Sequence, residues 1–410
     1  MKKVLIASIF VAAGLGLYAN EVTENSAVSV QSETATETEV ALTGEAPVAA
    51  PAPAAAPAEE QTTWQKVLAH MPKISGYLQT GFNYNSIGSH TATFQAKRLR
   101  LIMDGYITDK ASFRLQIEAF NGINIGDRYS AQKNLQVMDA FATYKFSQGF
   151  QIRAGQFYTP VGYENYDISP ATLETVDFSN ICYRMACRNA VGYDYVDYGR
   201  DLGIMLMGDV LPNAEKGFNY LSYNFALTNG HLPAADDNNK SKDIIGALTI
   251  RPIKELNIKV AYNWGQYKPY NPDSDTFKGV GNYQPLSRFV VGAWYNNPNG
   301  LDLRAEYGHL TAKNNGSDLV KETGFYVLAA YHCGAKWLPV VRYDMYRDDV
   351  NKTSLNNYDR GLIGLTYQPF GNLKIQFNYL LSHYTETAAN ASNGGKRNSS
   401  QILLMGLFKF

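Results

Sequence analysis

Apolar and polar residues alternate with a period of two along much of the chain between Ile74 and Phe410. In the segment NLKIQFNYLLS, apolar side chains take every second position from Leu373 to Leu381, and most positions between them are polar. A period of two predicts a β-strand, because successive side chains of a strand point to opposite faces. The final ten residues, QILLMGLFKF, have this period and the length of a tilted strand that crosses a bilayer. A buried strand of a soluble protein would look the same. The connections between the strands must therefore distinguish a membrane barrel from a soluble protein.

The alternation and the turn-forming residues between the alternating segments together predict sixteen strands. They span residues 74–85, 93–106, 111–121, 134–147, 150–158, 198–209, 217–229, 240–251, 255–267, 284–297, 300–313, 320–333, 336–347, 356–369, 372–385 and 397–410. Connections after even-numbered strands are mostly short, such as QG at 148–149, whereas those after odd-numbered strands are long and polar, such as 268–283. Barrels of the outer membrane have two unlike ends of this kind, with short periplasmic turns and long outer loops. We therefore expect an all-β protein, a transmembrane antiparallel β-barrel of about sixteen strands.

The polar face of several strands carries charge. In LDLRAEY, the charged residues Asp302, Arg304 and Glu306 alternate with apolar ones, and Arg114 and Glu118 do so in SFRLQIEAF. An unpaired ion in a dry core costs several kcal/mol, whereas a wide barrel hydrates it. The pattern therefore favours a water-filled lumen. Aromatic residues beside the short turns are expected to form a belt at the membrane surface. They are Phe146, Phe150, Trp337, Tyr367 and Phe408.

The N-terminal part of the chain differs from the rest. Lys2 and Lys3 precede an apolar run and the small residue Ala19 follows it, which predicts a secretory signal peptide over residues 1–20. A retained membrane anchor is the alternative, for which the apolar run is short. Residues 21–60 predict an Ala- and Pro-rich periplasmic linker, and residues 61–73 fit a short amphipathic helix before the barrel at 74–410. Export followed by membrane strands implies the outer membrane of a Gram-negative bacterium.

Charge is unevenly distributed along a chain that has 37 acidic and 37 basic residues. Residues 21–60 contain eight Glu and no Lys or Arg. Without these eight, and without Lys2 and Lys3, the body from residue 61 onward has 29 acids and 35 bases, a surplus of six positive charges. The simplest interpretation of the acidic linker is a solvated spacer, and a specific contact with the cell wall is the alternative.

Two segments are similar to a known family. IRAGQFYTPVGYEN (Ile152 to Asn165), followed downstream by GRDLGIMLMGD (Gly199 to Asp209), resembles the phosphate-selective porins of the O and P type. The resemblance extends over residues 74–410, including the terminal Phe410. It implies a sixteen-stranded porin, usually a homotrimer, whose long third loop folds into the lumen and narrows it. It also implies basic side chains along the path of anions.

Alternation places a set of charged side chains on the inward faces of the predicted strands. These candidates for the pore wall are Arg98, Arg100, Arg114, Glu118, Asp139, Arg153, Arg304, Glu306, Arg342, Asp344 and Lys374. A basic wall that faces acids makes a transverse field, which suits polar solutes of either sign. Salt bridges within the wall are the alternative role for the same residues.

The third loop, residues 159–197, contains six acids but only the two bases Arg184 and Arg188. A phosphate-selective constriction is expected to be basic, because a multiply charged anion exchanges hydration for fixed donors there. The candidates for the constriction are Glu164, Asp167, Arg184 and Arg188. Glu164 has two possible roles, holding the folded loop and setting selectivity. We did not find matches for the phosphate-coordinating side chains of the family, and we expect a general porin with at most weak anion preference.

Cys182 and Cys187 lie close together in the third loop, in the segment NICYRMACRN. An exported pair at this spacing is a candidate disulfide in an oxidising compartment, and two reduced thiols are the alternative. Cys333 would remain unpaired.

The sequence contains little that indicates an enzyme. The six His are scattered without the spacing of metal ligands, and there is no Gly-x-Ser-x-Gly motif. We expect no cofactor, no metal and no nucleic acid as partner. The expected partners are outer-membrane lipid and small hydrophilic or anionic solutes. An anion-selective channel, and an adhesin or structural barrel whose long loops bind partners, remain alternatives to the general porin.

Overall fold

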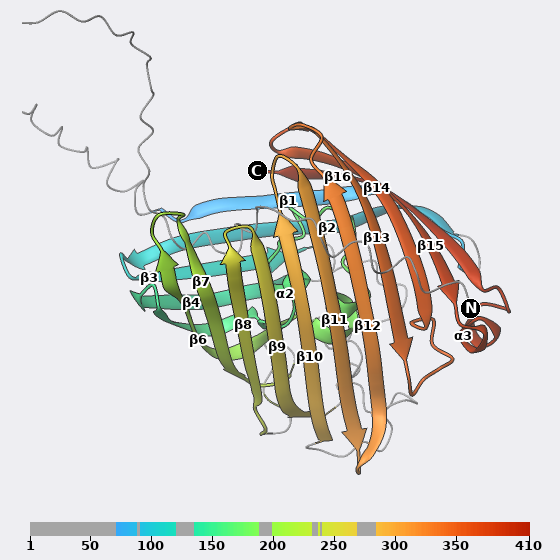
Figure 1. Ribbon diagram of the computed structural model, residues 1–410, viewed down its shortest axis with the longest axis horizontal. Helices are drawn as coiled ribbons and strands as arrows, with labels where there is room; N and C mark the ends of the chain where they lie inside the picture. Colours follow the sequence, from blue (N-terminus) through green and yellow to red (C-terminus); the bar gives the residue numbers. More distant parts are fainter. Residues whose placement is uncertain are drawn as a thin grey trace, which may run out of the picture.

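The computed structural model describes residues 71–87, 91–119, 135–187, 199–231, 237, 240–268 and 284–410. Within these residues, sixteen antiparallel strands form one closed barrel (Figure 1). The strands are β1 (Lys73–Asn85), β2 (Thr91–Thr108), β3 (Ala111–Glu118), β4 (Gln136–Ser147), β5 (Phe150–Tyr158), β6 (Arg200–Asn213), β7 (Phe218–Thr228), β8 (Asp243–Ile253), β9 (Leu256–Tyr267), β10 (Gln284–Asn296), β11 (Leu301–Asn314), β12 (Ser317–Tyr331), β13 (Trp337–Asp348), β14 (Tyr358–Phe370), β15 (Leu373–Tyr384) and β16 (Asn398–Lys409). Each strand pairs with its neighbours in the sequence, and β16 pairs with β1.

The C-terminal residue closes the seam between β1 and β16. The backbone N–H of Gly76 donates to a carboxylate oxygen of the C-terminal Phe410 at 2.9 Å, and the N–H of Phe410 donates to the carbonyl of Gly76 at 3.0 Å. A Cβ at Gly76 would lie 2.6 Å from the ring of Phe410. The missing side chain of Gly76 therefore makes room for the terminal ring, a pairing of glycine and aromatic residue that stabilises sheet edges.

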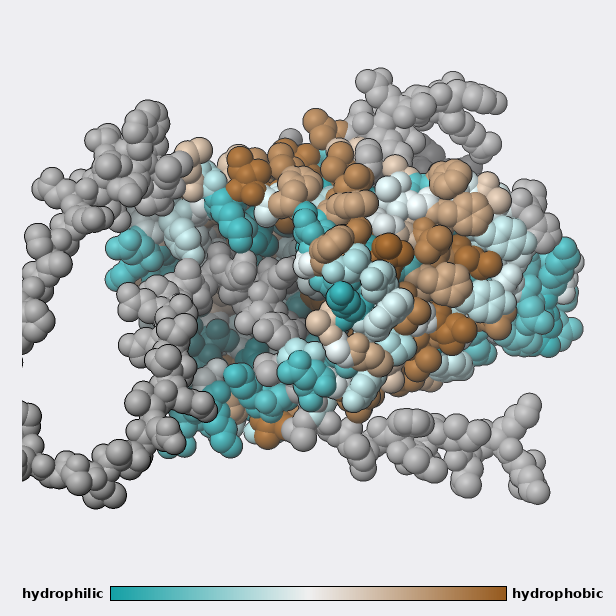
Figure 2. Space-filling model, turned by 90° about the horizontal axis from the view of Figure 1, so that it is seen from above, coloured by the Kyte–Doolittle hydropathy of each residue, from teal (hydrophilic) through white to brown (hydrophobic). Residues whose placement is uncertain are grey.

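The outer face of the barrel is apolar. Along β15, Ile375, Phe377 and Leu381 are exposed, whereas the side chains of Gln376 and Asn378 are buried on the inner face. Figure 2 shows brown, hydrophobic side chains over much of the visible barrel surface. An apolar outer surface of this extent fits a lipid environment and is not expected on a monomeric protein in water.

Exposed aromatic residues lie beside short turns. Phe146 and Phe150 flank the turn between β4 and β5, with ring centroids 5.2 Å apart. Trp337 at the start of β13 stacks on Tyr367 of β14 at 4.3 Å. These pairs are among the residues that the sequence predicts for the aromatic belt, and the rings of Phe146 and Trp337 are about half exposed.

The sixteen-stranded barrel predicted from the sequence is confirmed, and most strand ends differ from the prediction by one or two residues. The largest difference is at β6, which continues to Asn213 rather than ending at residue 209, because Pro212 and Asn213 still pair with β7. Among the described residues, three short helices were not predicted: α2 (Tyr163–Tyr166), the π-helix η1 (Ile181–Ala186) and α3 (Glu386–Ser392).

Residues 1–70 lie outside the part of the chain that the structure describes, and with them the predicted signal peptide, the linker and most of the short helix. Among the described residues, no helix is long and apolar enough to cross a membrane.

Candidate functional site

The described part of the third loop, residues 159–187, folds against the inner wall of the barrel, and we call it the inner loop. Its base is fixed beside the start of β6. Thr159 donates its backbone N–H to the carbonyl of Gly199 at 2.8 Å, and the amide Nδ2 of Asn165 donates to the carbonyl of Thr159 at 2.8 Å. Gly199 has a φ of 73°, and a Cβ there would collide with the side chain of Asn165 at 1.7 Å. Two parts of the sequence that resemble the porin family therefore meet at the base of the loop.

Glu164, in α2, ties the loop together. Its Oε2 accepts a hydrogen bond of 2.6 Å from the backbone N–H of Ser179, fifteen residues away. Its Oε1 faces Nη1 of Arg304 at 3.6 Å and Nη1 of Arg342 at 4.0 Å. Burial raises the pKa of Glu164 to about 7, although the two guanidinium groups act in the opposite direction. These contacts support the loop-holding role that the sequence left open.

The middle of the inner loop is anchored to β11, β13 and β15. Glu174 forms an ion pair with Arg304 at 2.9 Å, and its pKa is lowered because the attraction of Arg304, with hydrogen bonds, outweighs its burial. Backbone groups of the loop bond to polar side chains of the wall. The bonds are Lys374 Nζ to Leu173 O at 2.6 Å, Val176 N to Asn378 Oδ1 at 2.7 Å and Arg342 Nη1 to Asp177 O at 2.8 Å.

The π-helix η1 is held at its C-terminal end. Arg288 of β10 donates to the carbonyl oxygens of Met185 at 3.0 Å and Ala186 at 2.9 Å. Carbonyls at the end of a helix lack partners within the helix and carry a partial negative charge, so a guanidinium suits them. Arg184 of the same helix forms an ion pair of 2.6 Å with Glu322 of β12.

A glycine of the wall makes the space for this helix. Gly308 lies in β11 opposite Met185, and a Cβ at position 308 would be 2.5 Å from the sulfur of Met185 and 3.2 Å from the side chain of Ile181. The side chains of Met185 and Ile181 are buried. A larger residue at position 308 would therefore compete with the helix for the same volume.

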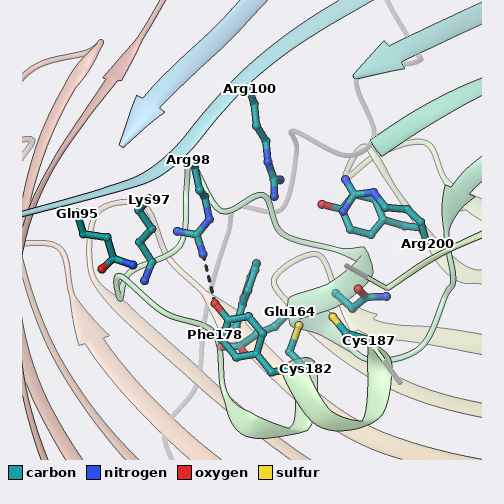
Figure 3. A pocket seen from close by; sticks show the side chains of 12 residues that line it. Gln95, Lys97, Arg98, Arg100, Glu164, Phe178, Cys182, Cys187 and Arg200 are labelled. Atoms are coloured by element: carbon teal, nitrogen blue, oxygen red, sulfur yellow. Dashed lines mark hydrogen bonds between the residues drawn. The ribbon is translucent and has the colours of Figure 1, made fainter. Parts of the chain in front are cut away.

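Cys182 and Cys187 are one turn of the π-helix apart, and the N–H of Cys187 donates to the carbonyl of Cys182 at 3.0 Å. Both side chains point from the helix toward the cavity (Figure 3). Both are buried free thiols in this structure, which is the second of the two alternatives that the sequence left open. Burial, followed by the neighbouring Cys187, raises the pKa of the Cys182 thiol well above its usual range, which favours the neutral form.

A cavity of about 160 Å³ separates the inner loop from the opposite wall. Four cations line it from the barrel side, whereas the acid Glu164 and the residues Phe178, Cys182, Tyr183 and Cys187 line it from the loop side. The cations are Lys97, Arg98 and Arg100 of β2 and Arg200 of β6 (Figure 3). The cavity is thus basic on its barrel side, and Glu164 is the one acidic side chain among its lining residues.

A β-bulge produces the row of cations on β2. The pairing of β2 with β1 shifts between Gln79 and Thr80, so Lys97 and Arg98 together oppose Gln79. A bulge lets two consecutive residues leave the strict alternation of a strand. Lys97, Arg98 and Arg100 all reach the same cavity for this reason.

Three of these cations have acidic partners in the wall or the loop. Arg100 forms an ion pair with Glu118 at 2.9 Å, Arg200 with Asp139 at 2.8 Å, and Lys97 with Asp177 at 2.6 Å. Such pairs cancel much of the field that each cation would project into the lumen.

Arg98 differs from these cations. Its guanidinium donates to the side chain of Gln79, to the carbonyl of Val176 at 3.2 Å and to the hydroxyl of Tyr183 at 3.3 Å, and it lies 5.8 Å from the ring centroid of Phe178. No carboxylate among the described residues forms an ion pair with it. Asp177, which pairs with Lys97, attracts Arg98 from beyond ion-pair distance, so the charge of Arg98 is compensated less directly than those of the other three.

The other predicted wall residues have well-defined positions. Arg114 binds Asp104 through two bonds of 2.7 and 2.9 Å, and both side chains are partly exposed. Arg153 donates to Thr143 at 3.1 Å and lies over the ring of Phe141 at 4.2 Å.

Glu306 binds both the inner loop and the wall, and Asp344 binds a residue of the wall. Glu306 accepts bonds of 2.6 Å from the N–H of Tyr163 and from the hydroxyl of Tyr326. Asp344 pairs with Arg342 at 2.9 Å. Of the remaining loop candidates, Asp167 pairs with Lys259 of β9 at 2.5 Å, and Arg188 lies outside the described residues.

Sequence reasoning missed several charged residues of this site: Lys97, Arg200, Lys259, Arg288 and Glu322. Lys259 alternates with Ile258 and Val260, so the rule that found the other wall residues could have found it. Arg288 has apolar neighbours on both faces of β10, and the bulge hides Lys97, so no local pattern indicates these two.

Comparison with known proteins gives a consistent result. The model of the family described as phosphate-selective porin O and P matches residues 73–196 and 256–408. No match was found among curated protein sequences. Solved structures with the same fold include an anion-selective porin from Comamonas acidovorans, at 14% identity and a TM-score of 0.59, with coverage of 83% of this chain and 99% of that one. OmpF of Salmonella typhi in complex with daunomycin has 15% identity, a TM-score of 0.62 and coverage of 84% and 99%. The trimer form of OmpT from Vibrio cholerae has 12% identity, a TM-score of 0.53 and coverage of 83% and 99%.

Proposed function

The chain belongs to the phosphate-selective porin O and P family and is an outer-membrane channel of a Gram-negative bacterium, and we propose that it is a general porin with at most weak anion preference. It would admit small hydrophilic solutes by passive diffusion. The family and the fold are those of channels rather than enzymes.

The charge balance of the narrow part of the lumen supports this proposal. The acids of the inner loop, Glu164, Asp167, Glu174 and Asp177, face cations of the wall and are engaged in holding the loop. They therefore repel anions less than their number suggests, and the wall cations that they face attract anions less as well. The charge that remains is a small positive excess, which Arg98 provides. Arg98 is the main support for the proposal, because the selectivity of a channel is set where its path is narrowest.

We also propose an arrangement for the whole chain. Residues 1–20 would be removed on export, residues 21–60 would form a periplasmic linker, and the short turns would face the periplasm. The oligomer would be a homotrimer, which is supported by the trimer form of OmpT among the proteins of the same fold. The apolar outer face would contact outer-membrane lipid.

The phosphate-selective channel is the second candidate, because four cations converge on one cavity. Reversal potentials in a salt gradient across a planar bilayer distinguish the two. A general porin gives a small potential of anionic sign, and Arg98→Ala reduces it, whereas Arg114→Ala, which removes a cation already paired with Asp104, changes it less.

Two results would contradict the general porin. Block of the chloride current by micromolar phosphate would favour the selective channel. Absence of stable open steps would favour an adhesin or structural barrel with a closed lumen.

A further inference from the structure

The cavity beside the inner loop has two chemically different sides, and the difference restricts the class of anion that fits it. The barrel side presents four cations of β2 and β6, whereas the loop side presents the rings of Phe178 and Tyr183 and the thiols of Cys182 and Cys187 (Figure 3). A buried free thiol packs as a small hydrophobic group. The loop side therefore offers mainly apolar surface.

The two rings of the loop side are fixed in their positions. Phe178 and Tyr183 meet edge to face, with centroids 5.7 Å apart and an angle of 72° between the rings. The hydroxyl of Tyr183 accepts a bond from Arg98 at 3.3 Å and donates to Asp177 at 3.2 Å, so its one donor is already used. An anion with oxygens on all sides, such as phosphate, would leave oxygens without strong donors here, which costs free energy.

Glu164 is the acidic side chain of the lining, and its carboxyl is engaged in other contacts. Its oxygens face the N–H of Ser179 and the guanidinium groups of Arg304 and Arg342. The two cations offset much of the repulsion that Glu164 would exert on an anion in the cavity.

Arg98 provides the binding point for one negative charge. Its bonds to Gln79, Val176 and Tyr183 use only Nη1 and Nη2, and no more than three of the five N–H donors of a guanidinium. Its Nε makes no hydrogen bond within the described part of the chain. The N–H of Nε and one N–H of Nη2 lie on the same edge of the guanidinium, and such an edge binds the two oxygens of a carboxylate. The other three cations already pair with acids, so the charge of the site matches a monoanion.

The size of the cavity suits an aromatic ring. A cavity of about 150 Å³ in a protein interior holds a benzene molecule. The cavity beside the inner loop has a volume of about 160 Å³.

We propose that this cavity binds a small monocarboxylate that carries an aromatic ring, with the carboxylate on Arg98 and the ring against Phe178 and the two thiols. Benzoate is the simplest member of this class. Binding is a property of the folded barrel alone, whereas its consequence, preferential interaction of aromatic acids with the pore, rests on the proposed porin function. Acetate has the same charge without the ring, and phosphate has charge without carbon surface, so these two anions are the matched comparisons.

Fluorine NMR of para-fluorobenzoate, added to the protein in detergent micelles, tests the binding. We expect the protein to broaden the fluorine line several-fold, and an excess of benzoate to sharpen it again. Acetate and phosphate at the same concentration should have little effect. Displacement by phosphate or acetate as effective as displacement by benzoate would show that the site recognises charge alone, and would overturn the proposal. This competition uses only the parent protein, so it does not depend on the folding of variants.

Two variants separate the contributions of the two sides. Arg98→Gln should reduce the broadening to that seen with micelles alone, and Phe178→Leu, which keeps an apolar side chain but removes the ring, should weaken binding several-fold. Arg114→Gln is the matched control, because Arg114 pairs with Asp104 and does not line the cavity. It should bind as the parent does. Equal broadening by the parent and by Arg98→Gln would assign the signal to partition into the micelle and would refute the site.

Conductance in planar bilayers tests the consequence for transport. Benzoate should reduce the chloride conductance several-fold more than acetate does at the same concentration, and Phe178→Leu should remove this difference. Stable open steps with equal effects of benzoate and acetate would contradict the inference and leave the general porin intact. Binding of para-fluorobenzoate without open steps would support the site and contradict the porin.

Discussion

At the scale of single residues, the buried carboxyl of Glu164 holds the inner loop against the wall of the barrel. Its two oxygens face the N–H of Ser179 and the guanidinium groups of Arg304 and Arg342, so it touches both the loop and the wall. The sequence identified Glu164 through the family motif. It did not reveal its partners, because Arg304 and Arg342 are far along the chain and only closure of the barrel brings them together.

The protonation of Glu164 predicts a pH dependence of the inner loop. Its pKa in the folded protein is raised to about 7 by burial, above its ordinary value of 4.5. A raised pKa means that folding favours the neutral form of Glu164. The contribution of neutral Glu164 to loop stability is therefore complete below about pH 4.5 and is lost as pH rises through about 7. The protection factors of amides 164–187 against hydrogen exchange, which are corrected for the intrinsic effect of pH, should therefore be higher at pH 5 than at pH 8.

The variant Glu164→Gln is the control for this pH effect, since an amide of the same shape cannot ionise. Its exchange rates, corrected for the intrinsic effect of pH, should be nearly independent of pH over that range. The same pH dependence in the variant would assign the effect to another group.

At the scale of elements, local patterns predicted the strands, whereas the inward fold of the third loop was expected only from the family resemblance and its contacts were not predicted. Strand β15 shows the reason, because Lys374, Gln376 and Asn378 alternate with lipid-facing residues and the pattern is local. The position of η1 depends instead on Gly308 and Arg288, which lie more than a hundred residues away in the sequence. Likewise, the bulge at Lys97 follows from the register between β1 and β2, which no pattern within β2 reveals.

The contact between Gly308 and Met185 predicts that Gly308→Leu displaces the π-helix from the wall. Overpacking a filled site costs about 1–3 kcal/mol, and the loop is more easily moved than the strand. Single-channel conductance should change, and its steps should become noisier, because η1 lines the narrow cavity with Cys182.

Gly361→Leu is the matched control for this substitution. Gly361 is also a strand glycine, in β14, but nothing lies within 4 Å of a Cβ placed there. Its conductance should equal that of the parent. Equal conductance of all three proteins would mean that the loop does not depend on the space at Gly308.

For the whole molecule, the barrel is a ring, and its stability depends on the one seam that joins the two ends of the strand order. The sequence predicted a last strand, residues 397–410, that ends on Phe410. It did not predict that the ring of Phe410 covers Gly76 across the seam, because this pairing joins residues at opposite ends of the chain.

Phe410→Ala should destabilise the barrel more than a comparable change elsewhere on the rim. The substitution removes the ring that covers Gly76 and loosens the last pair of β1 and β16, and a cross-strand aromatic contact is worth up to about 1 kcal/mol. Phe370→Ala is the control, because Phe370 is 66% exposed at the same end of the barrel, close to the 64% of Phe410, and lies in β14, away from the seam. Urea unfolding of refolded protein in lipid vesicles measures the two free energies without cellular assembly. Equal losses in both variants would show that the seam has no special dependence on its terminal ring, and closure would then rest on the backbone pairing of β1 with β16.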